Sequence, residues 1–334
     1  MDRPLLDTLG RPLEALRISV TDRCNLRCTY CMPKAAFAHH AFLPPAELLS
    51  FDELELLCRI FVGLGVRKIR LTGGEPLLRP QIEDMVARLA RMPELTELAM
   101  STNGLLLARH ARSLHEAGLR RLNLSLDAID DGVFGGINGM GQSAQQVLAG
   151  VDAALAEGFR LKVNMVVQRG VNEAQIRPMA RHFAGRGVPL RFIEFMDVGN
   201  VNNWTRAAVV SGAEIRELLR EDYDLEPQPI RPGETARRYR CRNTGAVFGF
   251  VDSVTAPFCR DCNRLRLSAD GRIFTCLFAR EGWNVGALLR SGLTESEIAR
   301  RINEVWTKRS DRYSEERAEK GSTAGKIEMS YIGG

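Results

Sequence analysis

The sequence predicts an α/β fold: an incomplete (β/α)6 barrel of the TIM type, followed by a smaller α+β domain. Short β-rich runs alternate with longer amphipathic runs from Leu13 to about Asp197, which is typical of βα units repeated around a parallel sheet. The alternation stops after about Asn200, and prolines then become frequent. The chain has 334 residues, more than one domain usually holds. We therefore predict one domain over residues 1–200 and a second over residues 201–334.

Six strands are predicted in the first domain, fewer than the eight of a closed barrel. They are Ala15–Val20, Lys68–Thr72, Glu97–Ser101, Arg121–Leu126, Leu161–Val167 and Leu190–Phe195. Ser50 and Glu53 form a capping box before a helix that ends near Gly63. In the second domain we predict strands at Val247–Val251, Arg264–Ala269 and Arg272–Cys276, and a helix at Glu295–Lys308.

Polar and small residues follow several of the predicted strands. Thr72-Gly73-Gly74-Glu75 and Thr102-Asn103-Gly104 are two such runs. In a barrel of parallel strands the active site lies at these C-terminal ends. Solvated loops are also polar, so one loop decides little, but several in succession favour a site at this edge. Lys162 and Asn164 are polar within an otherwise apolar strand, and we expect one of them to point inward.

Composition and charge narrow the class of function. Six of the eight cysteines fall into two clusters, and clustered cysteines in a reducing compartment more often bind metal than form disulfides. The net charge of +5 rests mostly on arginine, which reflects either a genomic preference or a polyanionic ligand. No block of like charges predicts a nucleic-acid tail, and no apolar run reaches the roughly 18 residues of a membrane span. The N-terminus has no secretory signal. We expect a cytoplasmic protein that binds neither nucleic acid nor membrane.

The first cysteine cluster, Cys24, Cys28 and Cys31, directly follows the first predicted strand. Three thiolates bind three irons of a 4Fe-4S cluster and leave the fourth iron for an outside ligand. A structural zinc would take a fourth protein ligand, and His39 or His40 is near enough in sequence to supply it. The position at a barrel strand end favours the iron–sulfur cluster, and zinc stays open.

A resemblance to a known superfamily begins at this cluster. Cys24-Asn25-Leu26-Arg27-Cys28-Thr29-Tyr30-Cys31 resembles the signature of the radical S-adenosylmethionine (SAM) superfamily, and Gly73-Gly74-Glu75-Pro76 resembles its second motif. The resemblance implies that the open iron binds SAM and that the reduced cluster splits SAM into methionine and a 5′-deoxyadenosyl radical. A glycine pair lets the backbone approach the methionine amino group, and Glu75 would add an acceptor near it.

The second cluster consists of Cys259, Cys262 and Cys276, so it again supplies three ligands and lacks a fourth. Cys241 would complete a four-cysteine zinc ribbon, and this alternative also stays open. Arg264 and Arg266 alternate along the next strand and so lie on one face. Two cations beside the thiolates suit an anionic ligand.

The run from Phe258 to Leu267 resembles the second-cluster motif of the GTP 3′,8-cyclase family. Thr21 to Pro33, Arg70 to Gly74 and the terminal Gly333-Gly334 are also similar to that family, so the resemblance spans nearly the whole chain. It implies two 4Fe-4S clusters, one for SAM and one for GTP. The implied reaction converts GTP to (8S)-3′,8-cyclo-7,8-dihydroguanosine 5′-triphosphate, the first step of molybdenum cofactor biosynthesis.

The resemblance also assigns site residues and partners. The six clustered cysteines would hold the clusters, and SAM would contact Tyr30, Gly74, Ser125 and Met196. GTP would contact Arg17, Arg70, Thr102, Lys162, Arg191, Arg264, Leu265 and Arg266. The catalytic set would be Arg17, Arg264 and Arg266 with Gly333 and Gly334, because the resemblance places the glycine tail inside the active site. We hypothesise that this tail positions arginines after the radical has formed. A flavodoxin-type or ferredoxin-type electron donor, a downstream cyclic pyranopterin monophosphate synthase and a homodimer are also implied.

Two other functions stay open. One is a different radical SAM enzyme with an auxiliary cluster, such as a peptide-modifying maturase, although those carry longer cysteine arrays. The other is a zinc-bearing module that binds RNA through its arginines. No histidine has an evident catalytic role, since His110, His115 and His182 fall in predicted helices, and Cys58 is expected to be a buried helical residue.

Overall fold

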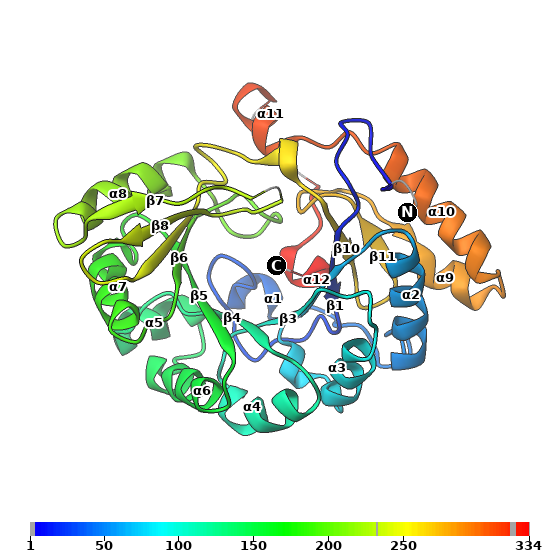
Figure 1. Cartoon of the computed structure of the whole chain (residues 1–334), viewed down its shortest axis with the longest axis horizontal. Helices are drawn as coiled ribbons and strands as arrows, with labels where there is room; N and C mark the ends of the chain where they lie inside the picture. Colours follow the sequence, from blue (N-terminus) through cyan, green and yellow to red (C-terminus); the bar gives the residue numbers. More distant parts are fainter. Residues whose placement is uncertain (1–3, 232, 321–324, 334) are drawn as a thin grey trace.

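The computed structural model describes residues 4–231, 233–320 and 325–333, and its centre is one curved β-sheet with helices around it (Figure 1). All six strands predicted for the first domain are present, and each begins and ends within one residue of its prediction. They pair in parallel in chain order. They are β1 Ala15–Ser19, β2 Lys68–Thr72, β3 Glu97–Thr102, β4 Arg121–Ser125, β5 Arg160–Val167 and β6 Leu190–Glu194. The prediction of a partial parallel barrel is confirmed.

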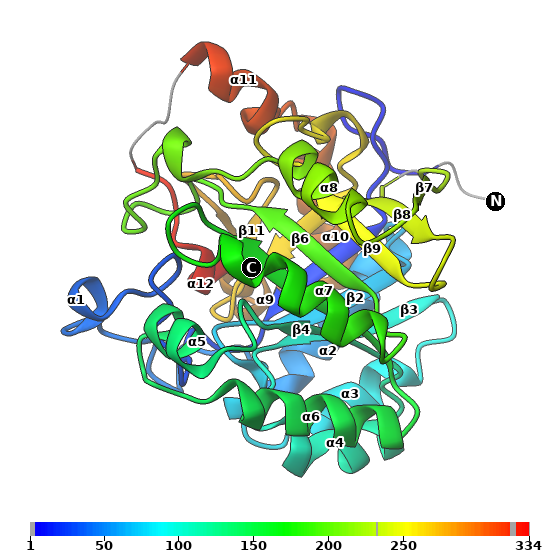
Figure 2. The ribbon, with the colours of Figure 1, turned by 90° about the vertical axis from the view of Figure 1, so that its left-hand side faces the viewer.

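Helices follow these strands and cover the outer side of the sheet (Figures 1 and 2). They are α2 Phe51–Gly63, α3 Ile82–Ala90, α4 Leu107–Glu116, α5 Asp131–Asn138, α6 Ala144–Ala156 and α7 Ile176–Ala184, after the short α1 Lys34–Phe37. Helix α2 begins at the predicted capping box, in which Ser50 Oγ accepts from the Glu53 backbone N–H and the Glu53 carboxylate accepts from the Ser50 N–H. Cys58 is fully buried in α2, and His110, His115 and His182 lie in α4 and α7, as predicted.

The second half of the chain extends the same sheet at both edges. Strand β9 (Val247–Val251) pairs in parallel with β6, and β10 (Arg264–Leu267) pairs in parallel with β1. Antiparallel strands continue outward from each: β8 Arg237–Cys241 and β7 Leu225–Pro227 beyond β9, and β11 Arg272–Phe274 and β12 Trp283–Asn284 beyond β10. Both edges of the six-stranded sheet offer unpaired backbone groups, and β9 and β10 satisfy them. The boundary near residue 200 remains a prediction, because one sheet crosses it.

The remaining helices belong to the second half. They are α8 Gly212–Arg220, α9 Val285–Arg290, α10 Glu295–Thr307, α11 Tyr313–Lys320 and α12 Met329–Ile332. The 3-10 turns are η1 Pro76–Leu78 and η2 Glu173–Gln175 in the first half, and η3 Arg206–Ala208 and η4 Cys259–Asp261 in the second. Helix α10 matches its prediction to one residue. Helix α11 stands at the periphery, whereas α12 lies inside the curve of the sheet (Figures 1 and 2). In the described part of the chain, no helix is both long and apolar enough to span a membrane.

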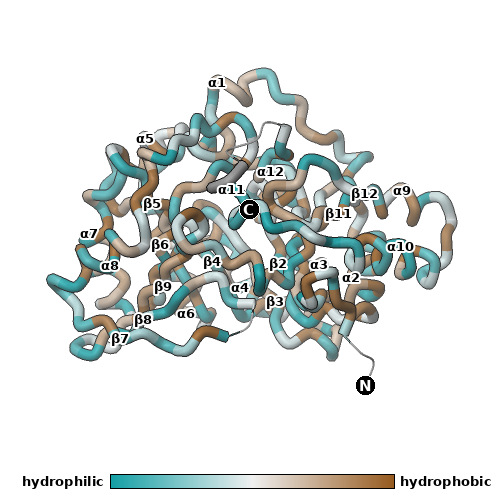
Figure 3. Tube along the Cα trace, turned by 90° about the horizontal axis from the view of Figure 1, so that it is seen from above, coloured by the Kyte–Doolittle hydropathy of each residue, from teal (hydrophilic) through white to brown (hydrophobic). Residues whose placement is uncertain are grey.

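The core lies between the sheet and the outer helices. Leu16 and Ile18 of β1 are fully buried there, so Arg17, between them, projects from the opposite face. Helices such as α7 and α10 carry both hydrophobic and hydrophilic segments (Figure 3), and Met179 and Phe183 bury the apolar side of α7. The inner face of the sheet is therefore left for polar and charged side chains.

Candidate functional site

The first cysteine triplet occupies the loop after β1. The Cys31 N–H donates to the Cys28 carbonyl at 3.0 Å, which closes the turn between them. Cys24 Sγ accepts from the Leu26 N–H at 3.4 Å, and Asn103 Nδ2 lies 3.9 Å from the same sulfur. Burial raises the pKa of Cys24 to about 11 and also raises the pKa of Cys28. Metal binding at this loop must therefore release protons from the thiols.

The structure does not support either zinc alternative, because the described side chains that would bind zinc do not come together. Within the described ranges, no three His, Cys, Asp or Glu side chains converge as one metal ion requires. His40 packs against the rings of Phe37 and Phe42, with centroids 4.6 and 4.9 Å away, and Cys241 is fully buried in the hydrophobic core. A four-iron cluster places its thiolates on different irons, so they need not converge on one point. Each triplet fits such a cluster with one iron open.

The loop after β2 packs directly against the first cysteine loop. The Gly74 N–H donates to the Thr21 carbonyl at 2.7 Å, and a Cβ on Gly74 would lie 2.3 Å from the Arg23 carbonyl oxygen. Only glycine fits there. Tyr30 donates its hydroxyl to Asp127 Oδ2 at 2.8 Å, which ties the cysteine loop to the end of β4. The structure thus brings Tyr30 and Gly74 to the first triplet, with Ser125 ending β4 and Met196 following β6.

Glu75 is buried and joins the ends of β2 and β3. Its carboxylate accepts from Thr102 Oγ1 at 2.7 Å, from the Asn103 N–H at 2.8 Å and from the Leu77 N–H at 3.1 Å. Burial raises the pKa of Glu75 to about 7. Its oxygens thus hold two strand ends together, and the expectation that Glu75 also provides an acceptor near the SAM amino group stays a prediction. The Thr102 hydroxyl is engaged in turn, since it also accepts from the Gly104 N–H at 3.1 Å.

A row of guanidinium groups crosses the inner face of the sheet. Arg17 on β1 is in register with Arg70 on β2 and with Arg266 on β10. Three neighbouring strands therefore carry arginines at the same level. Leu265, between Arg264 and Arg266, is fully buried in the core, so only its backbone is available on this face. The remaining predicted cations of this face are Arg264 on β10, Lys162 on β5 and Arg191 on β6.

These cations are crowded and lack carboxylate partners. Burial, with Arg266 and Arg70 next, lowers the pKa of Arg17 well below its usual range, and burial with Arg191 lowers the pKa of Lys162 to about 8. Among the residues that the structure describes, no carboxylate forms an ion pair with Arg17, Arg70, Lys162 or Arg191, and Arg70 Nε is buried without a partner. Unpaired cations that are partly removed from water, as these four are, carry a desolvation cost. The row is therefore suited to a polyanionic ligand.

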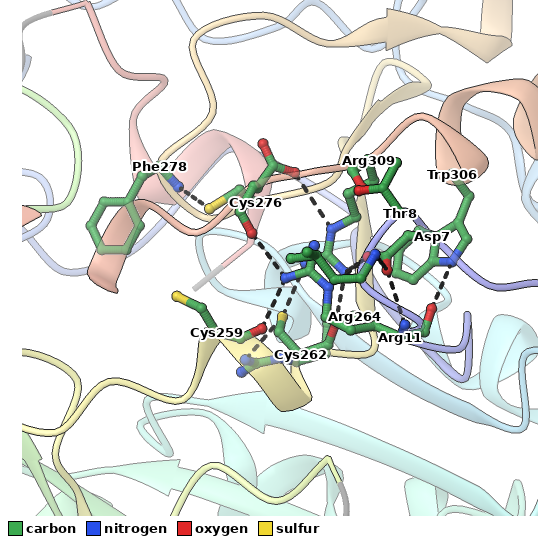
Figure 4. Close-up of polar contacts among 12 residues, drawn as sticks. Asp7, Thr8, Arg11, Cys259, Cys262, Arg264, Cys276, Phe278, Trp306 and Arg309 are labelled. Carbon is green, nitrogen blue, oxygen red and sulfur yellow. Dashed lines mark hydrogen bonds and ion pairs between the residues drawn. The ribbon is translucent and has the colours of Figure 1, made fainter. Parts of the chain in front are cut away.

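The second cysteine triplet lies beside Arg264 (Figure 4). Cys259 is the first residue of η4, Cys262 directly follows η4, and Cys276 follows β11. Arg264 Nη2 donates to Cys262 Sγ at 3.2 Å. Burial raises the pKa of Cys262, but Arg264 and Arg309 outweigh burial and lower it to about 6. The structure thus brings the second triplet and the predicted GTP arginines together.

The C-terminal tail reaches the same face. Helix α12 contacts β1, Ile332 is fully buried, and Arg266 Nη1 donates to the Gly333 carbonyl. Tyr331 donates its hydroxyl to Asp270 Oδ2 at 2.6 Å. Gly333 therefore lies beside a predicted catalytic arginine, as the tail hypothesis requires. Gly334 falls outside the described residues.

Asp197, just after β6, anchors the segment that leads into this tail. Lys326 Nζ donates to Asp197 Oδ2 at 2.7 Å and to its carbonyl at 2.6 Å. Arg317 Nε lies 2.8 Å from Oδ1, and the Tyr313 hydroxyl donates to Oδ2 at 2.5 Å. The three charged side chains are buried. Asp197 follows the carboxyl end of a barrel strand, and the structure gives it this structural role.

Replacing Asp197 with asparagine should lower the free energy of unfolding by about 3 kcal/mol, because Lys326 and Arg317 would stay buried without their counter-charge. Denaturant unfolding of the apoprotein at pH 7 measures this. Burial raises the pKa of Asp197, but Lys326, Tyr313 and Arg317 lower it below its usual value, so the stabilisation is present above the unfolded-state pKa and is lost as pH falls through the folded-state pKa. The control is Asp152→Asn, whose ion pair with Arg186 is exposed and worth at most about 1 kcal/mol. Equal effects of the two variants would refute the role.

Three residues at the cysteine loops were not predicted. Asn103 follows β3, and the polar run at that strand end was the available signal. Arg11 and Arg309 donate to the carbonyls of Cys259 and Cys262 across 248 and 47 positions of chain. No spacing in the sequence signals contacts of that separation.

Two family models match the chain. The model described as "Radical SAM superfamily" matches residues 18–183, and the model described as "Molybdenum Cofactor Synthesis C" matches residues 188–315. The chain is 47% identical to a GTP 3′,8-cyclase of Staphylococcus haemolyticus over 334 residues, which covers 98% of each chain. It is 45% identical to a GTP 3′,8-cyclase of Staphylococcus aureus over 340 residues, which covers 100% of each chain.

A solved structure also resembles this chain. The crystal structure of Streptococcus suis SuiB bound to S-adenosylmethionine superposes with a TM-score of 0.62, at 15% identity, over 94% of this chain and 69% of that one. At this identity the likeness shows the fold alone, and it agrees with the partial barrel and its extended sheet.

Proposed function

Because this chain belongs to the GTP 3′,8-cyclase family of the radical SAM superfamily, we propose that it converts GTP to (8S)-3′,8-cyclo-7,8-dihydroguanosine 5′-triphosphate while SAM is cleaved to methionine and 5′-deoxyadenosine. This reaction is the first step of molybdenum cofactor biosynthesis. Its cofactors are two 4Fe-4S clusters and SAM. The observation that carries the proposal is the row of partly buried and buried cations, Arg17, Arg70 and Arg266, beside the second of two cysteine triplets on one sheet.

We propose that the first triplet holds the cluster that binds SAM. When bound and reduced, this cluster supplies the electron that splits SAM. Gly74 lets the β2 loop pack directly against the cysteine loop, which would bring its backbone close to the methionine moiety of SAM. Tyr30 is oriented by Asp127, so its ring is fixed beside Cys28 and Cys31. Ser125 and Met196 complete the proposed SAM contacts.

We propose that the second triplet and the cation row bind GTP. The guanine would reach the open iron, and the triphosphate would be held by guanidinium groups, which bind phosphate through paired N–H groups. Arg17, Arg70 and Arg266 favour this because their register places three donors side by side. Lys162, Arg191 and Arg264 would add charge. Thr102 would contribute only after its hydroxyl leaves Glu75, and Leu265 only through its backbone.

The partners are proposed on the family alone. They are an electron donor of flavodoxin or ferredoxin type, a downstream cyclic pyranopterin monophosphate synthase and a second copy of this chain in a homodimer. A cytoplasmic location is proposed with them. Neither a peptide-modifying maturase nor a zinc-bearing RNA-binding module is favoured by any feature of the described site.

Anaerobic incubation with SAM, a reductant and GTP deuterated at C3′ tests this function. Deuterium should appear in 5′-deoxyadenosine, because the adenosyl radical takes the C3′ hydrogen, and mass spectrometry detects it. GTP deuterated at C2′ is the matched control and should transfer none. The reconstituted protein should hold about eight irons. Protium in 5′-deoxyadenosine from C3′-deuterated GTP would exclude the proposed abstraction.

A further inference from the structure

A buried set of charges ties the N-terminal segment and the segment after α10 to the second cysteine loop (Figure 4). Asp7 and Arg11 come from the N-terminal segment and Arg309 follows α10, and their exposed fractions are 8%, 2% and 4%. Asp7 Oδ2 accepts from Arg11 Nε at 2.6 Å and lies 3.4 Å from Arg309 Nη1. One carboxylate therefore holds two guanidinium groups that the proposed chemistry does not use.

Both Arg309 and Arg11 donate hydrogen bonds to the second cysteine loop. Arg309 Nη1 donates to the Cys262 carbonyl at 2.7 Å, and Arg309 Nη2 donates to the Cys262 sulfur at 3.2 Å. Arg11 Nη1 donates to the Cys259 carbonyl at 2.8 Å. The backbone of two cluster cysteines is thus fixed from one side, and one sulfur receives an N–H directly.

The guanidinium of Arg309 has little freedom to turn away. Its central carbon lies 4.6 Å from the ring centroid of Trp306, which is fully buried and donates its indole N–H to the Arg11 carbonyl at 3.2 Å. Thr8 Oγ1 donates to the Arg309 carbonyl at 2.6 Å. Backbone, ring and carboxylate together keep the Arg309 N–H aimed at the sulfur.

The two triplets differ in the hydrogen-bond donors that reach their sulfur atoms. In the described ranges, the sulfur of Cys24 has only the Leu26 N–H and the Asn103 amide as donors, and Arg27 reaches carbonyl oxygens, not sulfurs. The sulfur of Cys262 has two guanidinium donors at 3.2 Å, from Arg264 and Arg309. Hydrogen bonds to a cluster sulfur stabilise the reduced, more negative cluster and raise its reduction potential.

We propose that Arg309 is a positioning residue for the second cluster, which it retains and whose reduction potential it raises by holding the Cys262 carbonyl and sulfur together. Arg264 is assigned to GTP, so its N–H groups are shared with the substrate, whereas those of Arg309 are committed to Asp7 and the loop. The inference rests on the proposed function, since it requires a cluster at the second triplet.

The test compares Arg309→Gln and Arg309→Lys with the control Arg300→Gln, which removes an exposed arginine of α10. In reconstituted Arg309→Gln, a chelator should remove about half of the iron roughly tenfold faster than in the unchanged protein. A redox titration followed by electron paramagnetic resonance should give a more negative potential for the second cluster. SAM cleavage without GTP and the potential of the first cluster should not change. Arg300→Gln should match the unchanged protein throughout.

Arg309→Lys keeps the charge but not the two-point contact, so its release rate and potential should fall between those of the unchanged protein and Arg309→Gln. If thermal unfolding shows that Arg309→Gln does not fold, the iron release and the potential of Arg309→Lys test the proposal instead. Iron release and potential equal to the unchanged protein would overturn the proposal, as would equal acceleration for both clusters. If the unchanged protein holds only about four irons, the second cluster itself is absent and the proposed function fails first.

Discussion

Cys28→Ala is expected to abolish SAM cleavage and cyclisation of GTP while the second cluster remains. Cys28 is held in the turn that it forms with Cys31, and a cluster with two protein thiolates lacks the fixed geometry that leaves a single iron for SAM. Without that iron SAM loses the site at which the first cluster would bind and reduce it. Formation of 5′-deoxyadenosine should fall to the background rate, and iron content should fall from about eight to about four.

Two other cysteine variants make this result specific. Cys276→Ala should lose the second cluster and cyclisation but still form 5′-deoxyadenosine without GTP. Cys58→Ala removes a cysteine that is fully buried in α2 and should retain all the iron. SAM cleavage that survives in Cys28→Ala, or that is lost equally in Cys276→Ala, would contradict the division of labour between the two triplets.

Gly333→Ala is expected to lower cyclisation about a hundredfold while SAM still binds. Gly333 has φ +75°, and a Cβ there would lie 2.5 Å from Thr72 Cγ2. The tail would have to move, and Arg266 would lose the carbonyl that it now contacts. A displacement of about 1 Å at a reacting centre can cost a hundredfold in rate. The measurements are product formation and SAM binding by equilibrium dialysis.

Gly325→Ala is the matched control, because Gly325 has φ +82° in the same tail but nothing lies within 4 Å of its added Cβ. It carries a similar backbone strain without the clash, so cyclisation should stay within a fewfold of the unchanged protein. One residue added after Gly334 tests the same tail from its end and should also block product formation. Equal activity of the Gly333 and Gly325 variants would remove the tail from the mechanism.

The six strands of the first domain and the start of α2 could be predicted because their signals are local. Apolar residues at alternate positions, such as Leu16 and Ile18, place Arg17 on the inner face whatever its partners are. The capping box at Ser50 likewise needs only its own turn. The cysteine spacings belong to the same kind of signal, since cluster geometry restricts the length of the loop.

The roles of polar strand-end residues were less predictable. Glu75, Asp127 and Asp197 all follow strands, as active-site residues of a barrel do. In the structure Glu75 joins two strands, Asp127 orients Tyr30, and Asp197 anchors the tail. Position at a strand end fixes where a side chain is, and only its neighbours fix what it contacts.

By itself the sequence determined the partial barrel and the two cysteine triplets, because each depends on residues near one another in the chain, whereas Arg17, Arg70 and Arg191 were assigned only through the family resemblance. The tertiary structure alone decided that β9 and β10 extend the barrel sheet, that Gly333 meets Arg266, and that Asp7, Arg11 and Arg309 hold the second cysteine loop. These contacts join segments tens to hundreds of positions apart. Their partners are selected by open sheet edges and by buried charge, which arise only when the chain has folded.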